Sequence, residues 1–448
     1  MNDKREIFGW SMYDWANSAF STTVITAFLG RYLAGLINAQ AGVEKGGVFH
    51  LLGIPIVAES FFTYCVSISV LLQVFMLPIL GAIADYSHLK KRMLMLFASV
   101  GALLTVALFF IDGNRYVLGG LMFIVANLAF GASIVFYNAF LPQIASPDQR
   151  DRVSSFGWAM GYLGGGILLL LNLVLFMIAP SIGLGRALAA RISIGSAGVW
   201  WLAFGLFAFR RLRERGAQRA LPAGESYVSI GFKQLLGTLR EIRKYPTALR
   251  YLLAYLVYND GIQTVIVVST LFGETELRMD KTELLLLLLM VQGVAFLGAL
   301  LFGRLAGWLG AKRAIVASLL IWAVVSIWAQ LSLQSKIEFW VLGVVVGLVL
   351  GGSQALSRSL FSQMIPREKE AEFFSFYEIS DRGTSWTGTA LFGVVNQITG
   401  SMRTAIFSLI VLFVGGLLIL TTVNVQRAIR ESGNEEEAPA VEAAPAAA

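Results

Sequence analysis

The segment Gly81–Arg92, GAIADYSHLKKR, recurs in a shortened form at Gly303–Arg313, GRLAGWLGAKR. Both copies read glycine, any residue, isoleucine or leucine, alanine, then aspartate or glycine, and a basic pair follows at the same spacing. Each copy comes directly after one long apolar block and before another. A motif that recurs at equivalent positions of a hydrophobic chain indicates two related halves, a common arrangement in membrane transporters.

The rest of the chain consists mostly of apolar blocks of about twenty residues, the length that a helix needs to cross a bilayer. Of its 448 residues 56% are hydrophobic and 14% are charged, and the mean hydropathy is +0.70. Soluble domains are closer to a quarter charged. We therefore expect an all-α integral membrane protein with twelve transmembrane helices in two six-helix repeats. The expected spans are 8–37, 56–80, 93–111, 116–141, 153–179, 187–209, 250–272, 284–305, 314–333, 338–357, 373–398 and 403–425.

Lysine and arginine are distributed unevenly between alternate loops. With the N-terminus taken as cytoplasmic, the loops on its side hold about 23 basic residues and the opposite loops about eight, so the positive-inside rule places both termini in the cytoplasm. The expected location is a bacterial inner (plasma) membrane. The expected divisions are an N-terminal half (1–210), a cytoplasmic linker (211–249), a C-terminal half (250–426) and a disordered cytoplasmic tail (427–448).

The composition argues against several classes of function. One cysteine, Cys65, and two histidines, His50 and His88, offer too few ligands or catalytic groups, so we expect no metal, no cofactor and no enzymatic activity. The net charge of +7 lies in alternate loops, which indicates membrane topology rather than nucleic-acid binding. No phosphate-binding loop is present, so ATP is not expected to drive the protein directly. The expected partners are the lipid bilayer and a small-molecule substrate, with or without a proton, and the expected state is a monomer.

The repeated motif is interpreted as a gate. Its glycines would let helices turn and approach closely, and Asp85 would accept hydrogen bonds from a helix N-terminus. Its basic residues would anchor the loop at the inner headgroups. An ordinary charged turn explains a single copy equally well, but two equivalent copies favour the gate. The expected gate residues are Gly81, Asp85, Lys91, Arg92, Gly303 and Arg313.

The doubled motif resembles the loop signature of the major facilitator superfamily. The strings Tyr13–Phe20 (YDWANSAF), Tyr137–Pro142 (YNAFLP), Val153–Gly157 (VSSFG) and Gln354–Phe361 (QALSRSLF) resemble the branch that includes the autophagic vacuolar amino-acid effluxers and their bacterial relatives. The resemblance implies the major facilitator fold, transport by alternating access, and amino acids as candidate substrates. The chain departs from the superfamily pattern at Gly307, where an acid is usual, and its fifth span lacks the proline of the antiporter motif.

Acidic residues inside the expected spans are the first candidates for a binding site, because a charge at the bilayer centre costs about 2.5–3.5 kcal/mol. Asp260 lies near the middle of the seventh span, and Asp14 lies in the first span with Asn17 one helical turn away. Either acid could bind a substrate amine or carry a coupling proton. The alternative is that each satisfies a helix N-terminus or a neighbouring arginine. The expected substrate- or proton-binding residues are Asp14, Asn17, Asn138, Asp260 and Gln263.

A second charged group lies in the eleventh span. Glu378 and Arg382 are four residues apart and face each other on a helix, so a structural ion pair is expected there. Asp381 then has no obvious partner, and Arg358 in the tenth span is a candidate. These four residues form the expected intramembrane charge cluster.

These features favour a secondary-active or facilitative transporter of a small polar solute, with amino acids as the first candidates. One alternative is a non-transporting membrane sensor or assembly partner with a transporter-like fold, which predicts an additional domain or interaction surface. Another is an integral membrane enzyme, which would need a catalytic cluster at one interface. Neither feature is visible beyond the short tail, so transport is the leading hypothesis.

Overall fold

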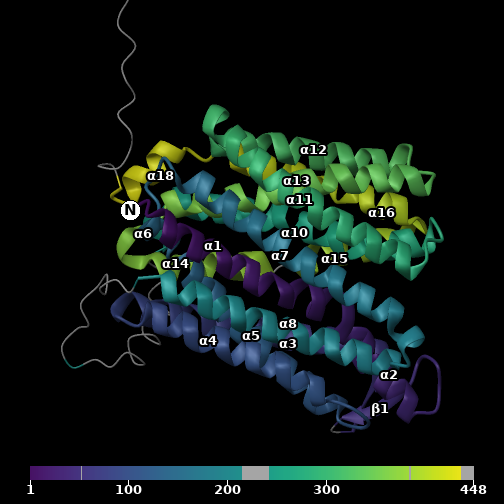
Figure 1. Ribbon diagram of the computed structural model, residues 1–448. Coiled ribbons are helices and arrows are strands. Elements are labelled where there is room, and N and C mark those ends of the chain that lie inside the picture. Colours follow the sequence, from purple (N-terminus) through teal and green to yellow (C-terminus); the bar gives the residue numbers. More distant parts are fainter. Residues whose placement is uncertain (52, 214–223, 225–241, 383–384, 435–448) are drawn as a thin grey trace, which may run out of the picture.

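A computed structural model describes residues 1–51, 53–213, 224, 242–382 and 385–434. These residues form two bundles of long helices that lie side by side (Figure 1). Eleven helical segments of the described chain are long and apolar enough to cross a membrane, and α14 (Glu370–Arg382) and α15 (Ser385–Thr399) lie where the remaining span is expected. The expected twelve-helix membrane fold is confirmed.

The N-terminal bundle begins with one long helical segment, Lys4–Gln40, that contains a π-helical stretch in its middle. A short antiparallel hairpin that the sequence did not predict follows, with Val48 paired to Val57. The elements of this half are α1 (Lys4–Ala19), the π-helix (Phe20–Phe28), α2 (Leu29–Gln40), β1 (Val48–Leu51), β2 (Ile54–Val57), α3 (Ala58–Tyr86), α4 (Lys90–Ala107), a 3-10 turn (Leu108–Phe110), α5 (Tyr116–Asn138), α6 (Leu141–Ile144), α7 (Arg150–Ile178), a second 3-10 turn (Ala179–Ile182) and α8 (Arg186–Arg211).

The C-terminal bundle repeats this pattern of long helices. Its elements are a 3-10 turn (Ile242–Lys244), α10 (Pro246–Thr275), α11 (Lys281–Leu309), α12 (Ala311–Leu331), α13 (Lys336–Gln363), a second 3-10 turn (Arg367–Lys369), α14 (Glu370–Arg382), α15 (Ser385–Thr399), α16 (Met402–Ser408), α17 (Ile410–Thr421) and α18 (Val425–Glu431). The described part of the predicted eleventh span, 373–398, lies in α14 and α15, on either side of residues 383–384.

Local sequence signals set several helix boundaries. Asp280 and Glu283 form a capping box at the start of α11, because the side chain of each residue accepts the backbone N–H of the other. Ser335 and Glu338 do the same for α13. Gly310 separates α11 from α12 at φ +83°, a backbone conformation that glycine adopts without steric cost.

Two polar segments were predicted, a linker (211–249) and a tail (427–448). Most of the linker, residues 214–223 and 225–241, lies outside the described residues. The tail does not begin at residue 427 as predicted, because α18 continues to Glu431 and Asn434 is buried. Asn434 donates from Nδ2 to the carbonyl oxygen of Ile365 at 2.9 Å, which attaches the end of this segment to the C-terminal half. Residues 435–448 lie outside the described part of the chain.

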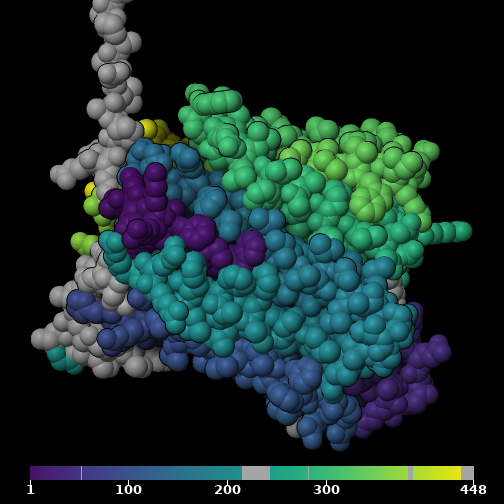
Figure 2. Space-filling model, in the orientation of Figure 1, coloured from purple at the N-terminus to yellow at the C-terminus, as the bar shows by residue number. Residues whose placement is uncertain are grey.

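The two halves form two layers that meet along the length of the molecule (Figure 2). The start of α1 and the last helix, α18, lie at the same end of this bundle (Figure 1). We call that end the termini side and the other end the opposite side.

Candidate functional site

A cavity of about 490 Å³ lies between the two halves. Helices α1, α5 and α7 line it on one side, and α10, α11, α13 and α14 line it on the other. Its size is typical of small-molecule pockets. Of the five expected binding residues, four line this cavity. They are Asp14, Asn17, Asn138 and Gln263.

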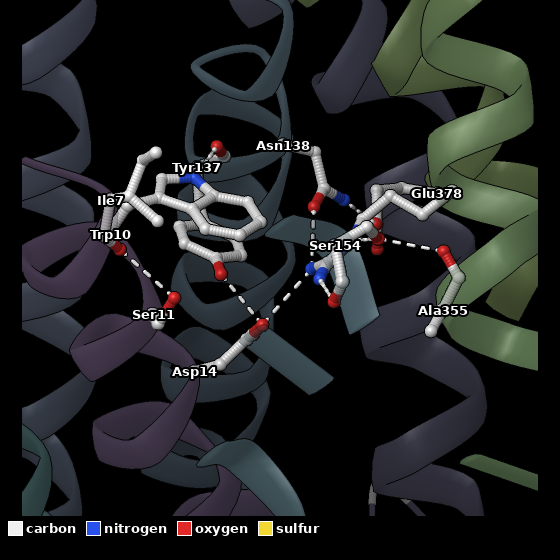
Figure 3. A network of polar contacts seen from close by, with 10 residues as sticks. Ile7, Trp10, Ser11, Asp14, Tyr137, Asn138, Ser154, Ala355 and Glu378 are labelled. Carbon is white, nitrogen blue, oxygen red and sulfur yellow. Dashed lines mark hydrogen bonds and ion pairs between the residues drawn. The ribbon is translucent and has the colours of Figure 1, made fainter. Parts of the chain in front are cut away.

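The end of the cavity nearest the termini is closed by an ion pair between the halves. Arg358 of α13 donates from Nη1 to Asp14 Oδ2 of α1 at 3.1 Å, and the Tyr137 hydroxyl donates to the same oxygen at 2.7 Å (Figure 3). Arg358 also donates to Asn138 Oδ1 at 3.3 Å and to the hydroxyl and carbonyl oxygens of Ser154, both at 2.9 Å. Four of the five guanidinium N–H groups are therefore engaged.

Aromatic rings enclose this guanidinium. Its central carbon lies 4.8 Å from the ring centre of Trp10, 5.5 Å from that of Tyr137 and 5.4 Å from that of Trp158. Arg358 is 2% exposed. A buried charge persists only where an opposite charge, hydrogen bonds or π-faces replace its hydration, and here all three do.

Further hydrogen bonds join the halves around the ion pair. Ser154 donates to the carbonyl oxygen of Ala355 at 2.7 Å, and Asn138 donates to Glu378 Oε1 at 2.8 Å (Figure 3). The predicted ion pair between Glu378 and Arg382 stays a prediction, because the Arg382 side chain lies outside the described part of the structure.

Asp381 lines the cavity from the last turn of α14. The Tyr255 hydroxyl donates to its Oδ1 at 2.6 Å, and Asn259 Nδ2 donates to the same oxygen at 3.0 Å. Both donors are neutral. Arg358, which the sequence suggested as its partner, instead pairs with Asp14.

Asp260 is placed differently from the other expected binding residues. It is not among the residues that line the cavity. Its Oδ2 accepts the backbone N–H of Gly388 in α15 at 2.8 Å, and the residue is 2% exposed. Both interpretations of Asp260, a binding residue and an acid that satisfies a helix N-terminus, stay predictions.

The first copy of the repeated motif crosses the interface on the termini side. Asp85, near the end of α3, accepts the backbone N–H groups of Ala371 and Glu372 at 3.1 and 2.9 Å. Gly81 permits this approach, because a Cβ there would lie 2.6 Å from the carbonyl oxygen of Ala371. The expected hydrogen bonding of Asp85 to a helix N-terminus is confirmed, and its role as a gate stays a prediction.

Not all of the basic residues of this motif face the headgroups. Lys90 is buried, with its Nζ 3.1 Å from Glu370 Oε2 and 3.8 Å from Asp85 Oδ1. Gln143 donates to the same Glu370 carboxylate. Glu370 therefore joins α4 and α6 of one half to α14 of the other, and Lys90 lies in this contact rather than at the headgroups.

The second copy lacks such an acid. At Gly303 a Cβ would lie 2.6 Å from Cβ of Ser155, so α11 packs closely on α7. At Gly307, which stands where the first copy has Asp85, a Cβ would meet open space. The exposed or half-buried lysines and arginines of the two copies are Lys91, Arg92, Arg304, Lys312 and Arg313.

These contacts define which end of the cavity is closed. The hydrogen bonds between halves gather on the termini side, where Arg150, 2% exposed, also donates to the carbonyl oxygen of Ser362 at 3.1 Å. Toward the opposite side the cavity extends to Thr26 and Thr270, whose side chains are exposed. The structure is therefore closed on the termini side and open on the opposite side.

Sequence reasoning did not identify three contributors to this closure. Arg150 was counted with the loop charges, Glu370 was not considered, and Ser154 entered only through the family resemblance. No local signal separates a basic residue that begins a buried helix from one in an exposed loop, since burial depends on the other half of the molecule.

Comparisons with known proteins agree with this architecture. The family model described as "Vacuole effluxer Atg22 like" matches residues 2–433. The chain is 32% identical to the "Uncharacterized MFS-type transporter YxiO" of Bacillus subtilis (strain 168), with 96% of this chain and 97% of that protein covered. It is 29% identical to "Autophagy-related protein 22" of Yarrowia lipolytica (strain CLIB 122 / E 150), with 86% and 79% covered.

Solved structures show the same fold at low sequence identity. FucP, a major facilitator superfamily (MFS) transporter in the outward conformation, superposes with a TM-score of 0.68 at 12% identity, covering 94% of this chain and 100% of FucP. The human organic anion transporter MFSD10 gives a TM-score of 0.67 at 12% identity, covering 93% and 99%. The chain has the major facilitator fold and belongs to the Atg22-like family of MFS-type transporters.

Proposed function

We propose that this protein moves a small polar solute across the membrane by alternating access, with amino acids as the first candidates. The cavity between the halves carries the proposal, because polar side chains of both halves face it and only its end on the termini side is closed. A state closed at one end is one of the two states that alternating access requires. The resemblance to vacuolar amino-acid effluxers supports the choice of solute.

The residues at the closed end suggest how a proton or a solute would act. Asp14 supplies the negative charge that faces Arg358, so neutralising that carboxylate would weaken the link between the halves. Asn17, Asn138 and Gln263 offer neutral hydrogen-bonding groups to the solute. Asp260 would act through α15 rather than touch the solute.

We further propose that the termini side is cytoplasmic and that the protein acts as a monomer in a bacterial plasma membrane. The excess of basic residues in the loops on the termini side supports the orientation. Under this orientation the structure is the outward-open state.

The test is uptake and efflux of a panel of labelled amino acids and other small metabolites in proteoliposomes, with and without a pH gradient. We expect the wild-type protein to move at least one member. Asp14→Asn removes both a protonatable group and the charge facing Arg358, so its transport should no longer respond to the pH gradient. If no member of the panel moves, the sensor interpretation is favoured instead, and an unchanged pH response in Asp14→Asn would exclude that residue as the coupling site.

A further inference from the structure

The structure assigns to the C-terminal wall of the cavity a binding site for a monovalent cationic group, centred on the carboxylate of Asp381. This site names a ligand class for the proposed transport and in that sense rests on the proposed function. An ammonium group of the solute and a free monovalent ion share the required chemistry, and the experiment below distinguishes them.

The charges around the cavity favour a positive ligand. The charged side chains that line it, among the residues described, are three acids and one arginine. Asp14 and Arg358 compensate each other at 3.1 Å. Among the described residues, the side chains that donate to Asp381 are the neutral Tyr255 and Asn259. A carboxylate away from bulk water is costly unless a positive charge offsets it, so a cation in the cavity would be stabilised here.

The geometry at Asp381 leaves an oxygen atom available to a ligand. Among the described residues, the side-chain bonds from Tyr255 and Asn259 both end on Oδ1, which leaves Oδ2 of this half-buried residue for the cavity.

The opposite wall is not an equivalent site for a carboxylate. Arg358 is the only cation among the described residues that line the cavity, and four of its five N–H groups are already engaged. Trp10 and Trp158 cover its faces. The cavity should therefore discriminate in favour of an amine over an acid of the same shape.

The experiment measures thermal unfolding of the purified full-length protein with three matched probes. They are L-phenylalanine, 2-phenylethylamine, which keeps only the ammonium group, and 3-phenylpropanoate, which keeps only the carboxylate. We expect the two ammonium compounds to raise the unfolding temperature in a saturable way and 3-phenylpropanoate not to do so. Asp381→Asn should weaken the apparent affinity for 2-phenylethylamine about tenfold or more, the loss expected for one charge-assisted contact.

Asp112→Asn is the matched control, because it makes the same chemical change at a half-exposed acid that pairs with Arg191 away from the cavity. A second arm replaces the amine with sodium or potassium chloride, against N-methyl-D-glucamine chloride at equal ionic strength. Stabilisation by the metal ions that is lost in Asp381→Asn assigns the site to an inorganic cation, and stabilisation by the amine assigns it to the solute.

Two results would overturn the site. One is equal stabilisation of the wild-type protein by the carboxylate probe and the amine probe, which needs no variant to fold. The other is cation binding by Asp381→Asn that matches the wild-type protein. Because binding is measured without transport, a protein that binds the amine but moves no solute contradicts the proposed function and leaves the cation site standing.

Discussion

The absence of a side chain at Gly81 permits the close contact between α3 and α14 on the closed termini side. A Cβ at this position would lie 2.6 Å from the carbonyl oxygen of Ala371 and 3.0 Å from Cα of Glu372, both backbone atoms that cannot rotate away. We expect Gly81→Ala to separate α3 from α14, weaken the bonds to Asp85 and destabilise the closed termini side by about 1–3 kcal/mol. A cysteine placed at Ser362, 1% exposed in that interface, should then react at least about fivefold faster with a membrane-impermeant maleimide.

The control for this substitution is Gly307→Ala, the corresponding position of the second motif, where a Cβ meets open space. Its labelling rate should equal that of the parent protein. Both measurements use a background in which the single cysteine, Cys65, is replaced by alanine. Equal labelling of the Gly81→Ala and Gly307→Ala proteins would show that the close approach of the two helices does not limit opening.

At the scale of elements, hydropathy predicted where helices cross but not which backbone groups their polar side chains meet. Asp260 of α10 accepts the N–H of Gly388 in α15. That bond joins residues 128 positions apart, and periodicity cannot report it.

The candidate site, too, could be predicted from the sequence only in part. Asp14, Asn138 and Gln263 could be predicted because polar residues in apolar spans are costly and usually face a partner or a cavity. The partner of Asp14 could not be predicted, since Arg358 lies 344 positions away. The sequence suggested Asp381 of the same half as a partner for Arg358, whereas its contacts come from the other half of the molecule.

The role of Asp260 at α15 yields a test by substitution. Asp260→Ala removes the acceptor for the Gly388 N–H and should destabilise the protein by about 1–3 kcal/mol, because a buried donor is left without its partner. Asp260→Asn keeps an acceptor oxygen and should lie close to the wild-type protein in a thermal unfolding measurement. If the two variants lose the same stability, the negative charge matters rather than the hydrogen bond.

At the scale of the whole molecule, closure of the termini side consists of separate contacts along one face of each half. Asp85 and Lys90 reach α14, Arg150 reaches the end of α13, and Arg358 reaches α1. Alternating access requires all of them to part together, because the halves move as packed units. A covalent link at one of these contacts should therefore hold the whole face closed.

Asp151 and Ser359 are suitable positions for introducing such a link. The Ser359 hydroxyl donates to Asp151 Oδ1 at 2.5 Å, joining α7 to α13 across the halves. With cysteines at both positions and Cys65 replaced, a short bifunctional thiol reagent should stop transport of any solute that the wild-type protein moves, and reductive cleavage should restore it. Cysteines at Asp112 and Arg191, whose side chains meet at 3.0 Å within one half, are the matched control and should leave transport unchanged when linked. Unchanged transport with the first link in place would mean that the halves do not separate at this contact, and the mechanism proposed for the protein would have to be abandoned.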